Sequence, residues 1–99
     1  MKRYTTHTNQ QYVIASNDVV ELPDQQFSGP AIDQFGRCED FLELIRKERE
    51  AIITEMDRLR ERNQTKSVRF RELFISKLVY ANIEAQLAHC GLSDSPKEL

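Results

Sequence analysis

Apolar residues recur at alternating intervals of four and three along residues 31–59. The positions are Ala31, Phe35, Cys38, Leu42, Ile45, Ile52, Met56 and Leu59, and one position of the series, Arg49, is charged. This interval keeps the side chains on one narrow stripe of an α-helix, which is the seam of a coiled-coil-like contact with a partner helix. Pro30 suits the first turn, with Ser28 or Gly29 as the cap. The sequence predicts a helix from residue 30 to about Arg62, with Gly36 as the point where it would bend or break.

A second predicted helix follows a turn at residues 63–65 and extends to about Cys90. Thr65 or Ser67 can cap its beginning, and Gly91 ends it, with Leu92 folding back on the last turn. One side of this helix carries Phe70, Phe74, Leu78, Ala81, Ala85 and Ala88, and roughly the opposite side carries Val68, Ile75, Val79, Tyr80, Ile83 and Leu87. Polar residues remain in two strips, which are Lys77 with Glu84 and Arg71 with Asn82 and His89.

A helix that is apolar on two sides needs a cover on two sides. The first helix is one cover, and the other is the N-terminal segment, a second copy of the chain, or both. Because a 99-residue chain buries a limited share of its surface, association is a favourable way to bury more. We therefore expect a homo-oligomer whose core and interface residues are Leu42, Ile45, Arg49, Ile52, Met56, Phe74, Leu78, Ala81, Ile83 and Ala85.

Residues 1–29 are predicted to be extended. Strand-forming residues occur at 4–8, at 12–15 and at 19–22, and the last two segments predict a β-hairpin around a turn at Ser16–Asn17–Asp18, closed by Pro23. Residues 23–29 are expected to be a linker, and 93–99 a loose polar tail. The predicted fold is mainly α: an antiparallel helical hairpin (30–92) with a short N-terminal β-hairpin (1–29), forming one domain that assembles as a dimer or larger helical bundle.

The bulk composition excludes several classes of protein. A net charge of −2 argues against a general nucleic-acid binder and against a membrane-surface protein. No apolar run approaches the length of a membrane span, and the N-terminus lacks the apolar core of a signal peptide. Two cysteines are too few for a disulfide framework, so a cytoplasmic location is expected.

Positive charge is concentrated in residues 58–77, which carry a net charge of +5. The cluster around the predicted turn consists of Arg58, Arg60, Arg62, Lys66, Arg69 and Arg71. One interpretation is compensation of the first helix dipole together with a solvated tip. The other is an anion-binding tip for a phosphate, a nucleotide or an acidic protein face.

The remaining chemistry-bearing residues do not predict a catalytic or metal site. His89 and Cys90 are neighbours on a helix and point in different directions, and His7 and Cys38 have no ligand spacing. We expect no enzyme activity, no metal and no cofactor. Arg49 has two interpretations: a stem packed at the edge of the seam with its head in water, which base rates favour, or a buried pair with a carboxylate such as Glu84.

Residues 27–40, with the sequence Phe-Ser-Gly-Pro-Ala-Ile-Asp-Gln-Phe-Gly-Arg-Cys-Glu-Asp, resemble a segment of short accessory proteins from bacteriophages and prophages of Gram-positive bacteria. That segment reads Gly-x-Ala-Ile-Asp-x-Leu-Gly-x-Tyr-Glu-Asp, and such proteins often open with Met-Lys-Arg-Tyr, as here. Phe35 and Cys38 stand where leucine and tyrosine are usual. The resemblance covers about the first 40 residues and carries over no functional residue.

The resemblance implies a phage accessory protein in the bacterial host cell, of a class that often modulates host processes without catalysis. The leading hypothesis is an oligomeric protein that binds and inhibits a host protein, such as an anti-phage defence factor. Two alternatives remain. One is an oligomeric binder that sequesters a phosphate-containing signalling nucleotide between subunits. The other is a nucleic-acid-associated regulator whose +5 segment contacts phosphates, for which binding would fall steeply with salt.

Overall fold

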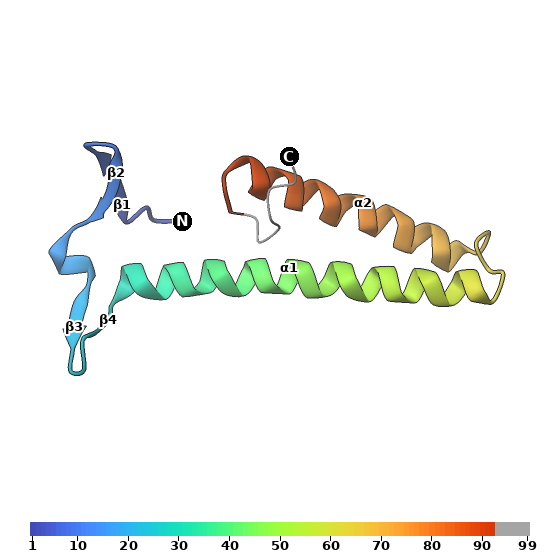
Figure 1. The fold of residues 1–99 in the computed structure, drawn as a ribbon, viewed down its shortest axis with the longest axis horizontal. Coiled ribbons are helices and arrows are strands. Elements are labelled where there is room, and N and C mark those ends of the chain that lie inside the picture. The colour runs from blue at the N-terminus through green and yellow to red at the C-terminus, as the bar shows by residue number, and fades with distance from the viewer. Residues whose placement is uncertain (93–99) are drawn as a thin grey trace. The chain divides into compact units, whose positions relative to one another are not determined.

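The computed structural model describes residues 1–92, and the predicted tail at 93–99 lies outside that range. The elements are β1 (Thr5–Thr8), β2 (Gln11–Ile14), a single 3₁₀ turn (Ser16–Asp18), β3 (Val20–Leu22), β4 (Gln26–Ser28), α1 (Pro30–Glu61) and α2 (Val68–His89) (Figure 1). The prediction of a mainly helical chain with two long helices and N-terminal antiparallel strands is confirmed. The chain divides into two compact units, Met1–Leu42 and Glu43–Leu99, and α1 contributes residues to both.

The N-terminal strands pair differently from the prediction. β1 pairs with β2 around Asn9 and Gln10, and β3 pairs with β4 around residues 23–25, so there are two small hairpins. Ser16–Asp18 joins the hairpins and does not close one, and the predicted linker contains β4. Asn9 and Gln10 both have positive φ angles, 50° and 65°, which the mirror-image turn of a two-residue hairpin loop requires. Asn-Gln lacks the glycine by which such turns are usually recognised, which is why the prediction was wrong.

Gly29 connects the second hairpin to α1. Its φ angle is +119°, and an added Cβ would lie 2.9 Å from the carbonyl oxygen of Asp18. The Gly29 carbonyl accepts the backbone N–H of Asp33 at 2.9 Å, which is the first hydrogen bond of the helix. Gly36, by contrast, lies within an uninterrupted α1, so the predicted bend or break is absent there.

The turn between the helices is built by backbone hydrogen bonds. At the end of α1, the N–H of Gln64 donates to the Leu59 carbonyl at 2.8 Å and the N–H of Asn63 donates to the Arg60 carbonyl at 3.0 Å. This is a Schellman motif, with Asn63 in the left-handed conformation at φ 58°. Ser67 then caps α2, because its hydroxyl oxygen accepts the N–H of Phe70 at 3.1 Å. One of the two predicted caps is thus confirmed.

The other end of α2 uses the same device. The N–H of Leu92 donates to the Leu87 carbonyl at 2.8 Å, and the N–H of Gly91 donates to the Ala88 carbonyl at 3.0 Å. Gly91 has a φ angle of 81°. The predicted stop at Gly91, with Leu92 folded back, is confirmed.

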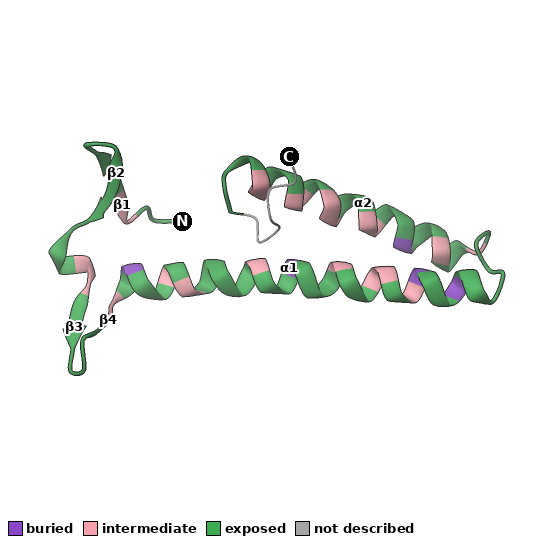
Figure 2. Cartoon of the chain, viewed as in Figure 1, coloured by how far each residue is buried: buried purple, intermediate pink, exposed green. Residues whose placement is uncertain are grey.

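The core of the second unit lies next to the turn. Met56 and Leu59 of α1 and Leu73 of α2 form the buried cluster, with Ile52 and Phe70 packed against it. In Figure 1, α2 returns antiparallel alongside the second half of α1, and Figure 2 shows buried residues of both helices near the turn. Ile45 of α1, which is also buried, lies farther from the turn. The predicted seam of α1 is therefore confirmed at Ile52, Met56 and Leu59.

The side of α2 that faces α1 is not either of the two predicted apolar sides. It is a row spaced three and four residues apart that passes through the predicted polar strip: Phe70, Leu73, Lys77, Tyr80, Glu84 and Leu87, all buried or half-buried. We call this row the inner seam. Leu73, its one fully buried member, belonged to neither predicted side. The same spacing would have revealed the row if charged residues had been allowed in it, as Arg49 was in α1.

Replacement of Asn63 tests the turn. Asn63→Ala should lower the free energy of unfolding by about 1 kcal/mol, because alanine tolerates the left-handed conformation less well than asparagine. Asn63→Gly should leave it unchanged or raise it. Urea unfolding followed by helical circular dichroism measures both, with exposed Gln86→Ala as the control. Equal stability of the alanine and glycine variants would contradict the left-handed cap.

The two glycines flanking the start of α1 should respond oppositely to alanine. Gly36→Ala should raise the free energy of unfolding by about 1 kcal/mol, since its Cβ meets nothing within 4 Å and alanine favours helix. Gly29→Ala should lower it, because the φ angle and the Asp18 oxygen both oppose a side chain. Thermal unfolding of the two variants, compared with wild type, measures the pair. Destabilisation by Gly36→Ala would show that the helix is not continuous there.

Candidate functional site

The basic cluster at the turn divides into paired and unpaired cations. Arg58 binds Glu55 and Arg60 binds Asp57, each with an N–O distance of 2.7 Å. Arg60 of α1 also lies over the ring of Phe70 of α2, with its Cζ atom 5.3 Å from the ring centroid. Both arginines are in the last turn of α1, where positive charge is favourable. Dipole compensation therefore accounts for Arg58 and Arg60.

The same compensation applies to Arg62, which directly follows α1, but it does not account for Lys66, Arg69 and Arg71. The side chains of Arg62, Lys66, Arg69 and Arg71 are exposed and, within residues 1–92, have no hydrogen-bond or ion-pair partner. Arg69 lies in the first turn of α2, which contains no acidic residue. Positive charge at the N-terminus of a helix opposes the helix dipole. Arg69 is therefore unfavourable for the dipole of α2, and no hydrogen bond or ion pair within residues 1–92 offsets its charge, although Glu72 lies three positions farther along the helix.

These four cations come from different parts of the turn and of α2. Arg62 follows α1, Lys66 lies in the connection, and Arg69 and Arg71 are about 200° apart around α2. Arg71 therefore lies on the side of α2 away from the core. We call Arg62, Lys66 and Arg69 the basic tip.

The side of α2 away from α1 forms a second row with the spacing of a seam. Its members are Val68, Arg71, Ile75, Leu78, Asn82, Ala85 and His89, and all seven are exposed (Figure 2). We call this row the outer seam. Val68, Ile75 and Leu78 expose 66%, 55% and 54% of their surface, and Phe74 and Val79 beside them are also exposed. Exposed apolar residues that lie close together on one side of a helix are typical of interaction surfaces.

The predicted interface residues occupy three environments. Ile45 and Met56 are buried; Leu42, Arg49, Ile52, Ala81 and Ile83 are half-buried; Phe74, Leu78 and Ala85 are exposed. The buried and half-buried residues of the second unit supply intramolecular packing. Phe74, Leu78 and Ala85 stay exposed in the described part of the chain.

Arg49 combines features of both its predicted environments. Its Nη1 lies 3.4 Å from Glu84 Oε1 across the two helices, so the predicted pair is present. The side chains remain 37% and 31% exposed, so the arginine head also reaches water. Its Nε, however, is buried with no hydrogen-bond partner in the described chain. The pair is therefore a weak contributor to stability, with a desolvated donor as its cost.

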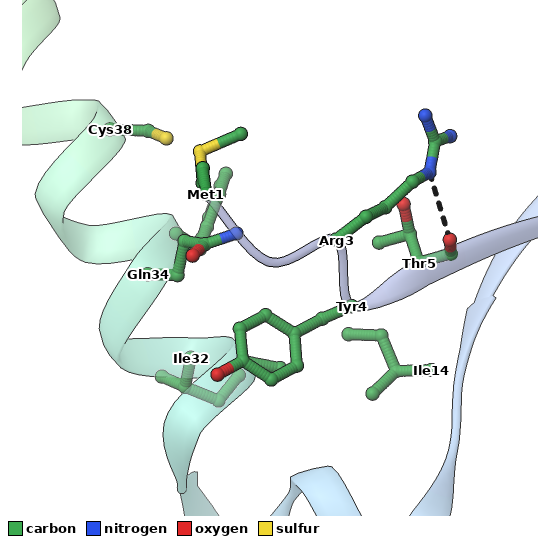
Figure 3. A pocket seen from close by; sticks show the side chains of 10 residues that line it. Met1, Arg3, Tyr4, Thr5, Ile14, Ile32, Gln34 and Cys38 are labelled. Atoms are coloured by element: carbon green, nitrogen blue, oxygen red, sulfur yellow. Dashed lines mark hydrogen bonds between the residues drawn. The ribbon is translucent and has the colours of Figure 1, made fainter.

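A cavity of about 390 Å³ lies in the first unit, between the N-terminal residues and the start of α1. Figure 3 shows the Tyr4 ring between Ile14 and Ile32, with Met1 and Cys38 above them. Its polar groups are partly used already, since Gln34 Nε2 donates to the Lys2 carbonyl at 2.7 Å and Arg3 Nε donates to the Thr5 carbonyl at 3.0 Å. The sequence did not predict this cavity, because it depends on the residues before β1 lying beside the start of α1. Its lining identifies no particular ligand.

Two features are absent from residues 1–92. No group of three or more histidine, cysteine or carboxylate side chains is arranged to hold a metal ion there. Neither helix in that range has the length and apolarity needed to cross a membrane.

Substitution of the Arg49–Glu84 pair tests its energetic role. Glu84→Gln alone should lower the free energy of unfolding by up to about 1 kcal/mol, as for a partly exposed ion pair. Arg49→Met with Glu84→Gln should be at least as stable as wild type, because the methionine keeps the packed stem and removes the buried Nε. Urea midpoints measure both, with exposed Lys47→Met as the control. A loss above about 1 kcal/mol in the double variant would show that the pair is strongly stabilising.

Comparison of the chain with protein-family models, with curated proteins and with solved structures found no match in any of the three.

Proposed function

We propose that this chain is a non-enzymatic, phage-type protein that binds an acidic surface of a host protein through the basic tip and thereby modulates that protein. The observation that carries the proposal is the set of exposed cations that have no partner within residues 1–92, namely Arg62, Lys66 and Arg69. Arg69 is maintained against the dipole of α2, which a purely structural role does not explain. Residues that violate a local stability rule are commonly functional.

The spread of the cations favours an acidic protein over a nucleotide. A nucleotide phosphate is gripped by donors that converge on one group. The tip residues instead come from the end of α1, the connection and α2, and Arg71 points to another side of α2. A protein face with several carboxylates can meet such a surface at several points.

The charge of the rest of the chain disfavours nucleic acid. Residues 36–57 carry a net charge of −3 and the whole chain −2. A polyanion longer than the tip would meet this acidic surface and be repelled. A partner with a bounded acidic face avoids that repulsion.

The identification of the partner as a host protein rests on the resemblance of residues 27–40 to phage accessory proteins. Within that class, an anti-phage defence factor is the partner that we propose. Inhibition then follows from occlusion, since no catalytic group is needed to block a surface.

Affinity capture tests the proposal. The full chain, tagged at its C-terminus, is incubated with lysate of a Gram-positive bacterium, and retained proteins are eluted with a salt gradient. We expect one stoichiometric partner that elutes as salt screens the contact. Arg62→Ala with Lys66→Ala should reduce its retention at least about tenfold, the loss expected when rim and tip charges that steer association are removed.

The matched control is Arg37→Ala with Lys47→Ala, which removes the same charge from exposed positions of α1. This variant should retain the partner like wild type. Absence of a stoichiometric partner, or equal retention by the tip variant, would overturn the proposal. A rise in melting temperature with a cyclic or linear nucleotide, lost in the tip variant, would replace the acidic protein with a nucleotide ligand.

A further inference from the structure

We infer that a second copy of this chain covers the outer seam, with the two α2 helices antiparallel and Arg71 of each copy opposite Asn82 of the other. This inference goes beyond the proposed function and does not depend on it, because the outer seam and the basic tip share no residue. It starts from the exposure of all seven outer-seam residues.

The chain leaves α2 poorly covered by itself. Leu73 is the one buried residue of the helix, while Val68, Phe74, Ile75, Leu78 and Val79 are each at least 45% exposed. The inner seam already has α1 as its partner, so a further helix has to dock on the opposite side. Two helical hairpins that pair through such sides make a four-helix bundle, which is a common solution for short hairpins.

The outer seam is complementary to itself in one antiparallel register. In this register Leu78 faces Ile75 of the second copy, and Val68 faces its Ala85. Arg71 faces its Asn82, whose amide oxygen accepts a charge-assisted hydrogen bond from the guanidinium. From Val68 to Ala85, each apolar residue thus meets an apolar one and each polar residue meets a polar one, while His89 lies beyond the paired stretch; the two-fold symmetry repeats every contact.

The other seam-to-seam arrangements lack this match. A shift of one heptad places Leu78 against Asn82 and Arg71 against His89 of the second copy, and a shift the other way places Arg71 against Ile75. A parallel pairing places Arg71 against Arg71, which repels. Burial of an unmatched polar group is unfavourable, so the matched register is selected.

Charge exchange tests both the partner and the register. Sedimentation equilibrium of the full chain should give twice the chain mass. Asn82→Lys places an ammonium opposite Arg71 of the second copy, and should raise the dissociation constant at least about tenfold. Arg71→Glu combined with Asn82→Lys restores opposite charges at both contacts, and should return the constant to within about threefold of wild type.

The matched control is Thr54→Lys, which adds the same charge at an exposed position of α1 away from both seams, and should leave the dimer intact. Circular dichroism checks that each variant is helical. A monomer at about 100 μM, where a functional dimer would be populated, would overturn the inference. So would a dimer that Asn82→Lys does not weaken, that the double variant does not restore, or that Thr54→Lys weakens equally. Failure of the host-protein capture leaves these measurements unaffected, so the two proposals fail separately.

Discussion

The contact of Met56 and Leu59 with Leu73 is the interaction on which the second unit depends. It lies within one or two helical turns of the connection, so the cost of closing the loop between its residues is small. The Schellman motif at Asn63 and the Ser67 cap set the directions in which the chain leaves α1 and enters α2. Hydrogen bonds at the turn thus set the directions of the two helices, and the apolar cluster stabilises their contact. Farther from the turn, the half-exposed pair of Arg49 and Glu84 spans the two helices.

The helices could be predicted because their signals are local. The seam spacing, Pro30, Ser67 and Gly91 each act within one turn of helix, and each is used in the structure as expected. The strand pairing could not be predicted in the same way, because Asn9 and Gln10 adopt positive φ angles that their identity does not demand. Two-sided exposure of the short strands also removes the alternation that normally sets register.

The sequence predicted which residues form the basic cluster, and the structure adds which of them are paired. Six cations near the turn are evident in the sequence. Only the structure separates Arg58 and Arg60, which are paired, from Arg62, Lys66, Arg69 and Arg71, which have no partner in the part of the chain that the structure describes. The orientation of α2 was hidden for a related reason. Lys77 and Glu84 appeared to mark a solvated strip, yet they belong to the inner seam, because a long polar side chain can lie over the edge of a contact with its charged end in water.

Because Arg69 lies in the first turn of α2, binding of an anion at the basic tip would be linked to the folding of the helical hairpin. An anionic group bound there would neutralise a charge that opposes the dipole of α2, and Leu73 of the core lies one turn farther along the same helix. Fraying of the first turn of α2 and release of the tip are therefore linked equilibria. A molecule that binds only the ordered tip shifts the chain toward its folded state. Binding at this end of the protein would therefore also reduce fraying of the first turn of α2.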